Sequence, residues 1–222
     1  MIYTVISTLN ENRIESTKRD CRIIRQPLSL LQKEISEYID CAKNDSVRAE
    51  RHLAYTTLIC SLKAFFDIDN IKLERTAGGK PYLSDSNIHI SLSHSDGAVA
   101  VAISDEGEIG VDIQSQIDVA REERLRNRFF TDLTVENNDI GVSYYFCEIN
   151  DFSAELYEAS LPYAEDCFTA KWSYAESLMK MSGGGFSDIG EIKHFSEISK
   201  CELKELTLSD KYILAVSCRD KE

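Results

Sequence analysis

Apolar residues follow a helical period most clearly over residues 168–186, FTAKWSYAESLMKMSGGGF. They recur at spacings of three and four, as in an amphipathic α-helix with one buried stripe, at Phe168, Trp172, Ala175, Leu178 and Met179. Acidic residues precede the segment, where the positive end of a helix favours them, and a run of three glycines ends it. Glu176 and Lys180 are four residues apart, so both side chains emerge on one face, beside the apolar stripe.

The same patterns divide the rest of the chain into helices and short strands. Apolar stripes predict further helices at residues 28–41, 46–66 and 119–130, with Ser46 as the N-cap of the second. Short apolar or alternating runs predict strands at residues 2–7, 88–93, 98–104, 109–113, 189–195 and 212–217. The strand at 98–104 is apolar on both faces, HSDG at 94–97 is typical of a turn, and RTAGGKPYL at 75–83 is typical of a loop.

Helices and strands in this arrangement predict an α/β (α+β) fold in which sheet packs on helix. Residues 131–165 are acidic, rich in tyrosine and weakly periodic, and we interpret them as an insertion. The strand endings VAIS at 101–104 and LAVS at 214–217 resemble each other, which suits two related halves. We therefore expect an N-terminal subdomain at 1–107 and a C-terminal subdomain at 108–222.

Composition excludes several classes of protein. The 222 residues, 43% of them hydrophobic, suffice for a globular core. No apolar run approaches the roughly 20 residues of a spanning helix and nothing resembles a signal peptide, so we expect a soluble cytoplasmic protein. Seven cysteines without a CxxC pair fit neither a disulfide framework nor a zinc site. The net charge of −13 argues against a nucleic-acid binder, and an anionic ligand would have to meet a local group of basic residues.

A polar pair interrupts the apolar strand expected at 109–113. In IGVDIQ, alternation places Asp112 and Gln114 on one face and their apolar neighbours on the other. With Glu176 from the helix, they form a set of oxygen ligands that Mg²⁺ accepts when water and phosphate fill the remaining positions. Two simpler interpretations stay open here: Asp112 caps a strand, and Glu176 and Lys180 form an exposed ion pair.

Basic residues are candidates for an anion site. Ser93 and His94 stand at a strand-to-turn junction, where both side chains can meet a phosphate, although His94 is also compatible with an ordinary turn histidine. Lys80 in GGKP resembles half of a P-loop, but GxxxxGK[ST] is absent, which argues against a nucleoside triphosphatase. The sequence also lacks HExxH, GxSxG and GxGxxG. The arginines at 121–128 form either a solvated helix face or a local positive surface.

Five segments, taken in order, resemble one enzyme family. Arg51 at a helix start, GGKPYL, ISLSHS, IGVDIQ and W-x-x-x-E-S-x-x-K are together similar to the 4′-phosphopantetheinyl transferases (holo-[acyl-carrier-protein] synthases) of the surfactin-synthetase-activating type. The resemblance covers residues 46–113 and 168–186. It implies two similar subdomains related by a pseudo-twofold axis, each with a small mixed or antiparallel sheet packed on a long helix. Coenzyme A and Mg²⁺ would bind in the cleft between them.

The resemblance also implies a reaction, in which the 4′-phosphopantetheine arm of coenzyme A passes to a serine of an apo acyl or peptidyl carrier protein and adenosine 3′,5′-bisphosphate is released. By this resemblance Asp112, Gln114 and Glu176 would hold the metal. The catalytic residues would be Glu176, which takes the serine proton, Lys180, which stabilises the leaving phosphate, and His94. Contacts to the phosphates and nucleotide of coenzyme A would come from Arg51, Lys80, Ser93, His94 and Lys180.

Two positions depart from the family pattern. Gln114 stands where the family usually has glutamate, which removes a negative charge from the metal site. Ala175 stands where a lysine usually precedes Glu176, and Lys171, nearly one helical turn earlier, is the candidate to replace that cation. These departures support an alternative, a degenerate homologue that binds coenzyme A or a carrier without turnover. A hydrolase that removes the arm has no support in the sequence.

The resemblance further implies partners. We expect coenzyme A and an apo carrier of fatty-acid biosynthesis or of secondary metabolism, with no nucleic acid and no membrane, and the two-subdomain organisation favours a monomer. Because carriers are typically acidic and this chain is acidic overall, we expect the arginine segment at 121–128 to provide a local docking surface.

Overall fold

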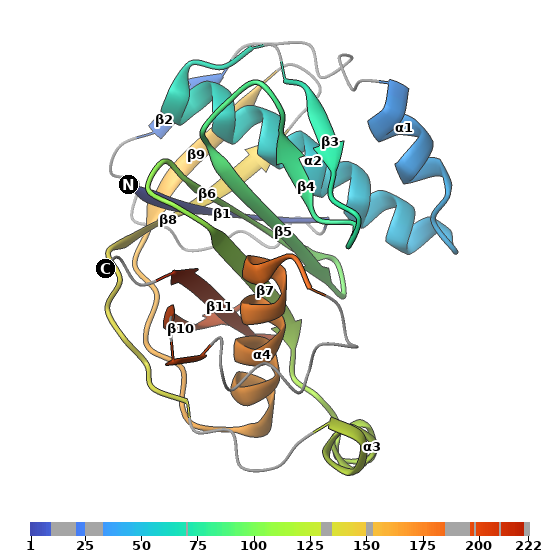
Figure 1. Cartoon of the computed structure of the whole chain (residues 1–222), viewed down its shortest axis with the longest axis vertical. Helices are drawn as coiled ribbons and strands as arrows, with labels where there is room; N and C mark the ends of the chain where they lie inside the picture. The colour runs from blue at the N-terminus through green and yellow to red at the C-terminus, as the bar shows by residue number, and fades with distance from the viewer. Residues whose placement is uncertain are drawn as a thin grey trace.

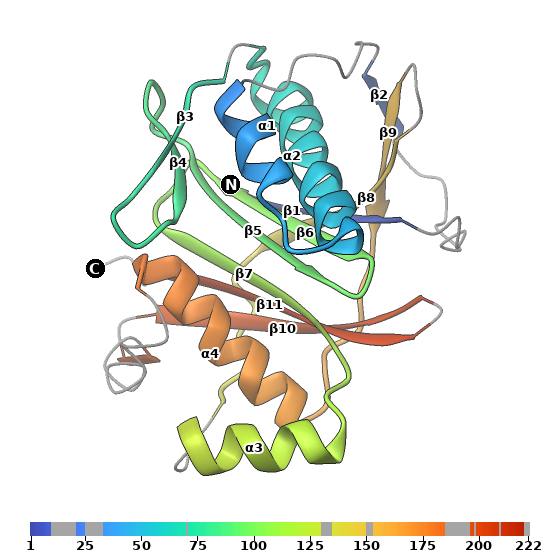
Figure 2. The ribbon, with the colours of Figure 1, turned by 90° about the vertical axis from the view of Figure 1, so that its right-hand side faces the viewer.

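In the computed structural model, the chain is a mixed α/β protein in which two sheets pack face to face and helices cover their outer sides (Figures 1 and 2). The structure describes residues 1–9, 21–24, 33–69, 71–129, 135–149, 153–184, 196–197, 199–208 and 210–219. The mixed α/β class predicted from the sequence is confirmed. The strand predicted at 189–195 lies outside the described residues.

The larger sheet has six strands in the order β2-β9-β8-β1-β6-β5. They are β1 (Ile2–Thr8), β2 (Cys21–Ile24), β5 (His89–Ser95), β6 (Ala98–Ser104), β8 (Val142–Ile149) and β9 (Ala154–Ala159). Neighbouring strands are antiparallel except β1 and β8, which run parallel. Asp96 and Gly97, with φ of 46° and 83°, make the two-residue turn between β5 and β6. The turn predicted at 94–97 is therefore too long, because His94 and Ser95 still pair within β5.

The smaller sheet has three antiparallel strands in the order β10-β11-β7. They are β7 (Ile109–Ser115), β10 (Ser199–Thr207) and β11 (Lys211–Arg219). The strands predicted at 109–113 and 212–217 are confirmed as β7 and β11, each slightly longer than predicted. A separate hairpin of β3 (Leu73–Arg75) and β4 (Pro81–Leu83) occupies both ends of the segment predicted as a loop at 75–83.

Strand β6 is apolar on both faces because it lies between two cores. Ala98, Ala100 and Ala102 pack with residues of the smaller sheet such as Val111 and Leu214. On the opposite face of β6, Val101 and Ile103 pack against helices α1 (Lys33–Asp40) and α2 (Asp45–Phe66). Small alanines on one face and branched residues on the other let the sheets approach closely while the helices fill the outer layer.

Helix α4 (Phe168–Ser182) covers the outer face of the smaller sheet, as Figure 2 shows. It ends where Gly183 adopts a left-handed conformation with φ of 74°. A Cβ on Gly110 of β7 would lie 1.9 Å from the Ser177 carbonyl oxygen, so the helix crosses β7 in direct backbone contact. The predicted helix and its apolar stripe are both confirmed.

The remaining helices agree with prediction except at their ends. Helix α2 is confirmed, but Asn44 caps it and not Ser46, since the Asn44 side-chain oxygen accepts a hydrogen bond of 2.8 Å from the Val47 amide. Helix α1 lies within the range predicted at 28–41, of which 28–32 is outside the described residues. Helix α3 (Val119–Phe129) packs Leu125 beside Phe168 and Trp172 of α4.

The segment interpreted as an insertion is part of the main architecture. Strands β8 and β9 fall within 131–165: β8 pairs with β1 in the middle of the larger sheet, and β9 pairs with β8 and β2. The weak periodicity has a physical reason: most β8 and β9 side chains on both faces contact other layers, so no simple polar–apolar alternation results. The chain therefore returns to the first sheet after β7, and the subdomain boundary at 107/108 stays a prediction.

Candidate functional site

A cavity of about 330 Å³ lies where β5 and β7 meet the β3–β4 hairpin and the C-terminal half of α4. We call it the main cavity. Its lining includes all eight residues selected from the sequence: Arg51, Lys80, Ser93, His94, Asp112, Gln114, Glu176 and Lys180. Residues from five separate segments of the chain therefore meet at one place.

Strands β5 and β7 belong to different sheets, and serine side chains join them. The Ser91 hydroxyl accepts a hydrogen bond of 3.0 Å from the Val111 amide. Two residues on, the Ser93 hydroxyl donates one of 2.9 Å to Asp112 Oδ1. The Ser95 hydroxyl accepts one of 3.2 Å from the Ser115 amide. We call this contact the serine seam, and it results from the period of two in SLSHS, which turns all three hydroxyls to one side.

Asp112 occupies the centre of the site. It is 2% exposed, and its Oδ1 accepts hydrogen bonds from Ser93 (2.9 Å) and from Lys180 Nζ (2.7 Å). Its other oxygen, Oδ2, is buried and accepts no hydrogen bond from the residues that the structure describes. A buried carboxylate oxygen without a donor is costly unless a cation or a proton lies next to it.

Glu176 brings a second carboxyl group to the same place. It lies on α4 one turn before Lys180, and its Oε2 is 4.0 Å from Lys180 Nζ. Burial and the negative charge of Asp112 raise the pKa of Glu176 to about 8, against an opposing effect of Lys180. The pair is not the exposed ion pair of the simpler interpretation, because Lys180 bonds to Asp112 and Ser93 while Glu176 is held in a poorly solvated position.

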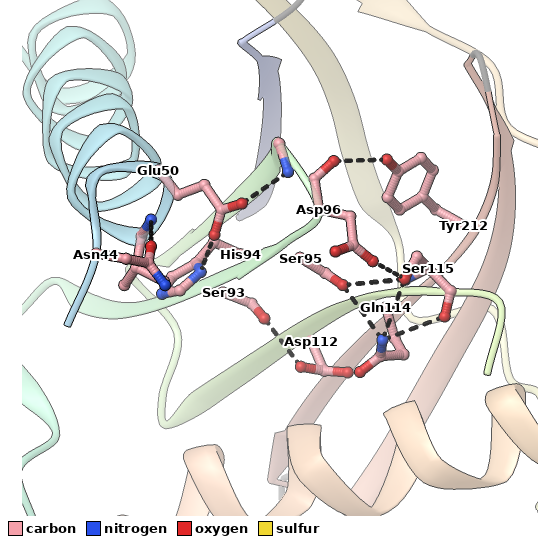
Figure 3. Close-up of polar contacts among 12 residues, drawn as sticks. Asn44, Glu50, Ser93, His94, Ser95, Asp96, Asp112, Gln114, Ser115 and Tyr212 are labelled. Carbon is pink, nitrogen blue, oxygen red and sulfur yellow. Dashed lines mark hydrogen bonds and ion pairs between the residues drawn. The ribbon is translucent and has the colours of Figure 1, made fainter. Parts of the chain in front are cut away.

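Gln114 completes the polar face of β7 (Figure 3). Its Nε2 donates hydrogen bonds of 3.2 Å to the Ser95 hydroxyl and to the Ser115 carbonyl, and its Oε1 lies 3.5 Å from a guanidinium nitrogen of Arg121. The predicted alternation of β7 is confirmed, since Val111 and Ile113 point into the core between the sheets.

The carboxylates fit a magnesium ion but do not enclose one. Within the described residues, no group of three or more His, Cys, Asp and Glu side chains surrounds a possible metal position. Asp112 Oδ2 lacks a partner among the described residues, Glu176 brings a half-buried carboxyl group to the same cavity, and Gln114 contributes a neutral oxygen. Such a set suits Mg²⁺, which keeps water and phosphate among its ligands.

His94 and Ser93 point to opposite sides of β5. Ser93 faces β7, whereas His94 Nδ1 lies 2.6 Å from Glu50 Oε2 on α2. Sequence reasoning missed Glu50, which is only 5% exposed. A signal was present: Glu50 lies three residues after Val47 and four before Ala54, inside the apolar stripe of the predicted helix, where a charged residue requires a partner.

Arg51 and Arg75 form the cationic end of the main cavity. The Arg51 guanidinium carbon lies 4.3 Å from the centre of the Tyr38 ring, and that of Arg75 lies 3.7 Å from it. Arg51 also donates to the Tyr38 carbonyl at 2.9 Å, while its buried Nε bonds to none of the described residues. Arg75, which the sequence reasoning did not select, bonds to the hydroxyl of Tyr55 and to the Gly79 carbonyl.

Lys80 also has a structural role that the sequence did not indicate. Its ammonium donates hydrogen bonds to the backbone carbonyls of Met181 and Ile109. Burial lowers the pKa of Lys80 to about 8. Gly78 allows this contact, because a Cβ there would lie 2.4 Å from the Gly183 carbonyl oxygen.

The candidate replacement for a missing lysine does not reach the site. Ala175 is 1% exposed in the core between α4 and the smaller sheet. Lys171 pairs with Asp166 at the start of α4, at 3.5 Å, and does not line the main cavity. The expectation that Lys171 substitutes for the cation is therefore wrong.

Comparisons with known proteins add no assignment, since neither the protein-family models nor the curated proteins that were searched give a match to this chain. Among the described residues, no helix has the length and apolar character needed to cross a membrane.

Proposed function

We propose that the protein is a 4′-phosphopantetheinyl transferase that moves the arm of coenzyme A to a serine of an apo carrier protein. The observation that carries the proposal is the pairing of Asp112 and Glu176 beside Lys180 in the same cavity as the cations Arg51, Arg75 and Lys80. A pair of carboxylates suits a metal and a proton acceptor, and the cations suit a polyphosphate ligand.

Glu176 is the proposed proton acceptor. In the metal-free protein, burial and the charge of Asp112 raise its pKa to about 8, so this carboxylate has a strong tendency to take up a proton. The serine hydroxyl of the carrier gives its proton to Glu176, and its oxygen forms a bond to the β-phosphorus of coenzyme A as the bond to the leaving adenosine 3′,5′-bisphosphate breaks. Lys180 stabilises the charge on the departing phosphate. Mg²⁺ held by Asp112, Glu176 and Gln114 would neutralise charge on the pyrophosphate.

Arg51, Lys80, Ser93 and His94 are proposed to bind the phosphates and nucleotide of coenzyme A. Arg51 supports this role through a buried Nε that has no hydrogen-bond partner in the part of the chain that the structure describes. Lys80 uses two of its three N–H groups on carbonyls, which leaves one for a ligand. Arg75 is added to this group because it stands next to Arg51 on the Tyr38 ring.

The finer architecture is also part of the proposal. Helix α2 packs on β5 and β6, helix α4 packs on β7 and β11, and β5 lies beside β7, as a pseudo-twofold pair would require. The sheets nevertheless differ, with six and three strands. We propose a cytoplasmic monomer that acts on carriers of fatty-acid biosynthesis or of secondary metabolism.

One observation favours the alternative of a binding protein without turnover. Lys180 bonds directly to Asp112 at 2.7 Å, which supplies Asp112 with a positive charge from within the protein. A homologue that had lost its metal could keep this ion pair and still hold coenzyme A on its cationic wall.

Intact mass spectrometry of apo carrier proteins decides between these functions. Acyl and peptidyl carriers are incubated with the protein, coenzyme A and Mg²⁺, beside Glu176→Ala and a chelator control. A mass gain of one phosphopantetheine that requires both Mg²⁺ and Glu176 supports the transferase. Coenzyme A binding by calorimetry without any gain on several carriers would instead support the binding protein.

A further inference from the structure

Glu50 connects helix α2 to the tip of the β5–β6 hairpin (Figure 3). One carboxylate oxygen, Oε1, accepts a hydrogen bond of 2.8 Å from the Gly97 amide. The other, Oε2, lies 2.6 Å from His94 Nδ1. Both oxygens are therefore occupied, and the side chain is 5% exposed.

The same turn is held from the opposite side by the smaller sheet. The Tyr212 hydroxyl donates a hydrogen bond of 2.9 Å to the Asp96 carbonyl, and the Ser115 hydroxyl bonds to the Asp96 carboxylate. The turn is thus fixed between α2 and the smaller sheet. His94, in β5 just before it, keeps one ring edge on Glu50 and lines the main cavity.

Resting on the proposed function, we propose that Glu50 is a positioning residue, which fixes the ring orientation and the proton of His94 so that Nε2 faces the phosphates of coenzyme A. The two hydrogen-bond partners of Glu50 determine which nitrogen of His94 carries the proton. The Gly97 amide can only donate, and an ionised carboxylate can only accept, so His94 Nδ1 must carry a proton. Nε2 is then the nitrogen left for a ligand in the main cavity.

Glu50→Gln tests the inference because an amide has only one acceptor oxygen. The Gly97 amide retains that oxygen, so the new NH₂ group faces His94 Nδ1, which must then become the acceptor. The proton of the neutral ring moves to Nε2. We expect this variant to raise the KM for coenzyme A about tenfold, since the carboxylate that holds the ring and its proton is lost, and to change kcat by less than about threefold.

The ring proton is observable without any enzymatic assay. Two-dimensional ¹H–¹⁵N spectra of the imidazole nitrogens, taken where the ring is neutral and assigned with His94→Gln, show which nitrogen carries the proton. Protonation at Nδ1 in the native protein and at Nε2 in Glu50→Gln is the expected result. Native His94 protonated only at Nε2 overturns the inference, even if Glu50→Gln does not fold.

Glu202→Gln is the matched control for a general loss of stability. Glu202 is as deeply buried as Glu50 and also accepts a backbone hydrogen bond, from Ile140, but it does not line the main cavity. A tenfold higher KM in both variants would refute a specific effect of Glu50. If the native protein transfers no phosphopantetheine arm, the proposed function is refuted independently of Glu50. The dissociation constant for coenzyme A, measured by calorimetry, then takes the place of KM. Equal dissociation constants for the native protein and Glu50→Gln would overturn the positioning role.

Discussion

Lys80 Nζ donates a hydrogen bond of 2.7 Å to the carbonyl oxygen of Met181, and this bond joins the β3–β4 hairpin to the last turn of α4. The second bond of the same ammonium, 3.2 Å to the Ile109 carbonyl, adds the start of β7. A single side chain thus connects three of the segments that line the main cavity. Lys80 therefore stabilises one wall of the main cavity in addition to contributing a positive charge.

Lys80→Met should lower the free energy of unfolding by about 1–3 kcal/mol, because two buried carbonyls lose their donor. It should also make the β3–β4 hairpin easier to cleave by a protease. Chemical denaturation and limited proteolysis measure these effects. Lys72→Met is the control, since Lys72 is exposed and pairs with Glu74 in the same region, at 3.6 Å. Equal stability of the two variants would contradict the connecting role.

Glu176 makes stability depend on pH in a defined direction. Its folded pKa of about 8 lies above the ordinary value of 4.5, so the native protein keeps a proton that the unfolded chain releases. In the absence of metal, the free energy of unfolding should therefore contain a contribution that falls as pH rises from about 4.5 to 8. Glu176→Gln should lack it, which denaturation at several pH values tests.

Mg²⁺ binding should show the converse dependence. The ion requires the ionised carboxylate of Glu176, so its affinity should increase as pH rises toward 8 and binding should release a proton. Calorimetry in buffers of different ionisation enthalpy counts that proton. An affinity that does not change with pH would mean that Glu176 is not a ligand of the ion.

Gly110→Ala should be among the most damaging substitutions in β7. The added Cβ would lie 1.9 Å from the Ser177 carbonyl oxygen and 2.5 Å from the Met181 amide, both of them backbone atoms that cannot move aside without displacing α4. We expect a loss of about 3 kcal/mol or more, measured by thermal or chemical denaturation. Gly107→Ala, where a Cβ meets nothing within 4 Å, should leave stability nearly unchanged.

Two arginines of α3 should separate binding of the carrier from binding of the coenzyme. Arg124 is exposed, whereas Arg121 approaches Gln114 and opposes the rise in the pKa of Glu176. Arg124→Glu should raise the KM for the acidic carrier and leave that for coenzyme A unchanged. Arg121→Glu should impair both and lower kcat. If Arg124→Glu changes neither constant, the carrier docks elsewhere.

The spacing of apolar and polar residues predicted individual helices and strands, because these depend mainly on neighbouring residues in the sequence. The period of three and four at 168–182 located α4, and alternation in IGVDIQ placed Asp112 on the face that meets that helix. The N-cap was harder to predict, because Asn44 and Ser46 are both good caps and only the hydrogen bond to Val47 identifies the true one.

Contacts between segments that are far apart in the sequence could not be predicted from such local patterns. The parallel pairing of β1 with β8 joins residues about 140 positions apart, and neither strand carries a local signal for its partner. The partner of His94 was hidden for the same reason. Glu50 was visible as a charge in an apolar stripe, yet only the packing of α2 on β5 shows that the two side chains meet.

The serine seam has a consequence for how the two halves of the site can diverge. Hydrogen bonds between two backbones fix a register whatever the side chains are, but here the hydroxyls of Ser91, Ser93 and Ser95 hold β5 against β7. The position of His94 relative to Asp112 along the two strands therefore depends on these individual serine side chains. Substitutions at alternate positions of SLSHS would change the spacing between β5 and Asp112 one hydroxyl at a time, without rebuilding either sheet.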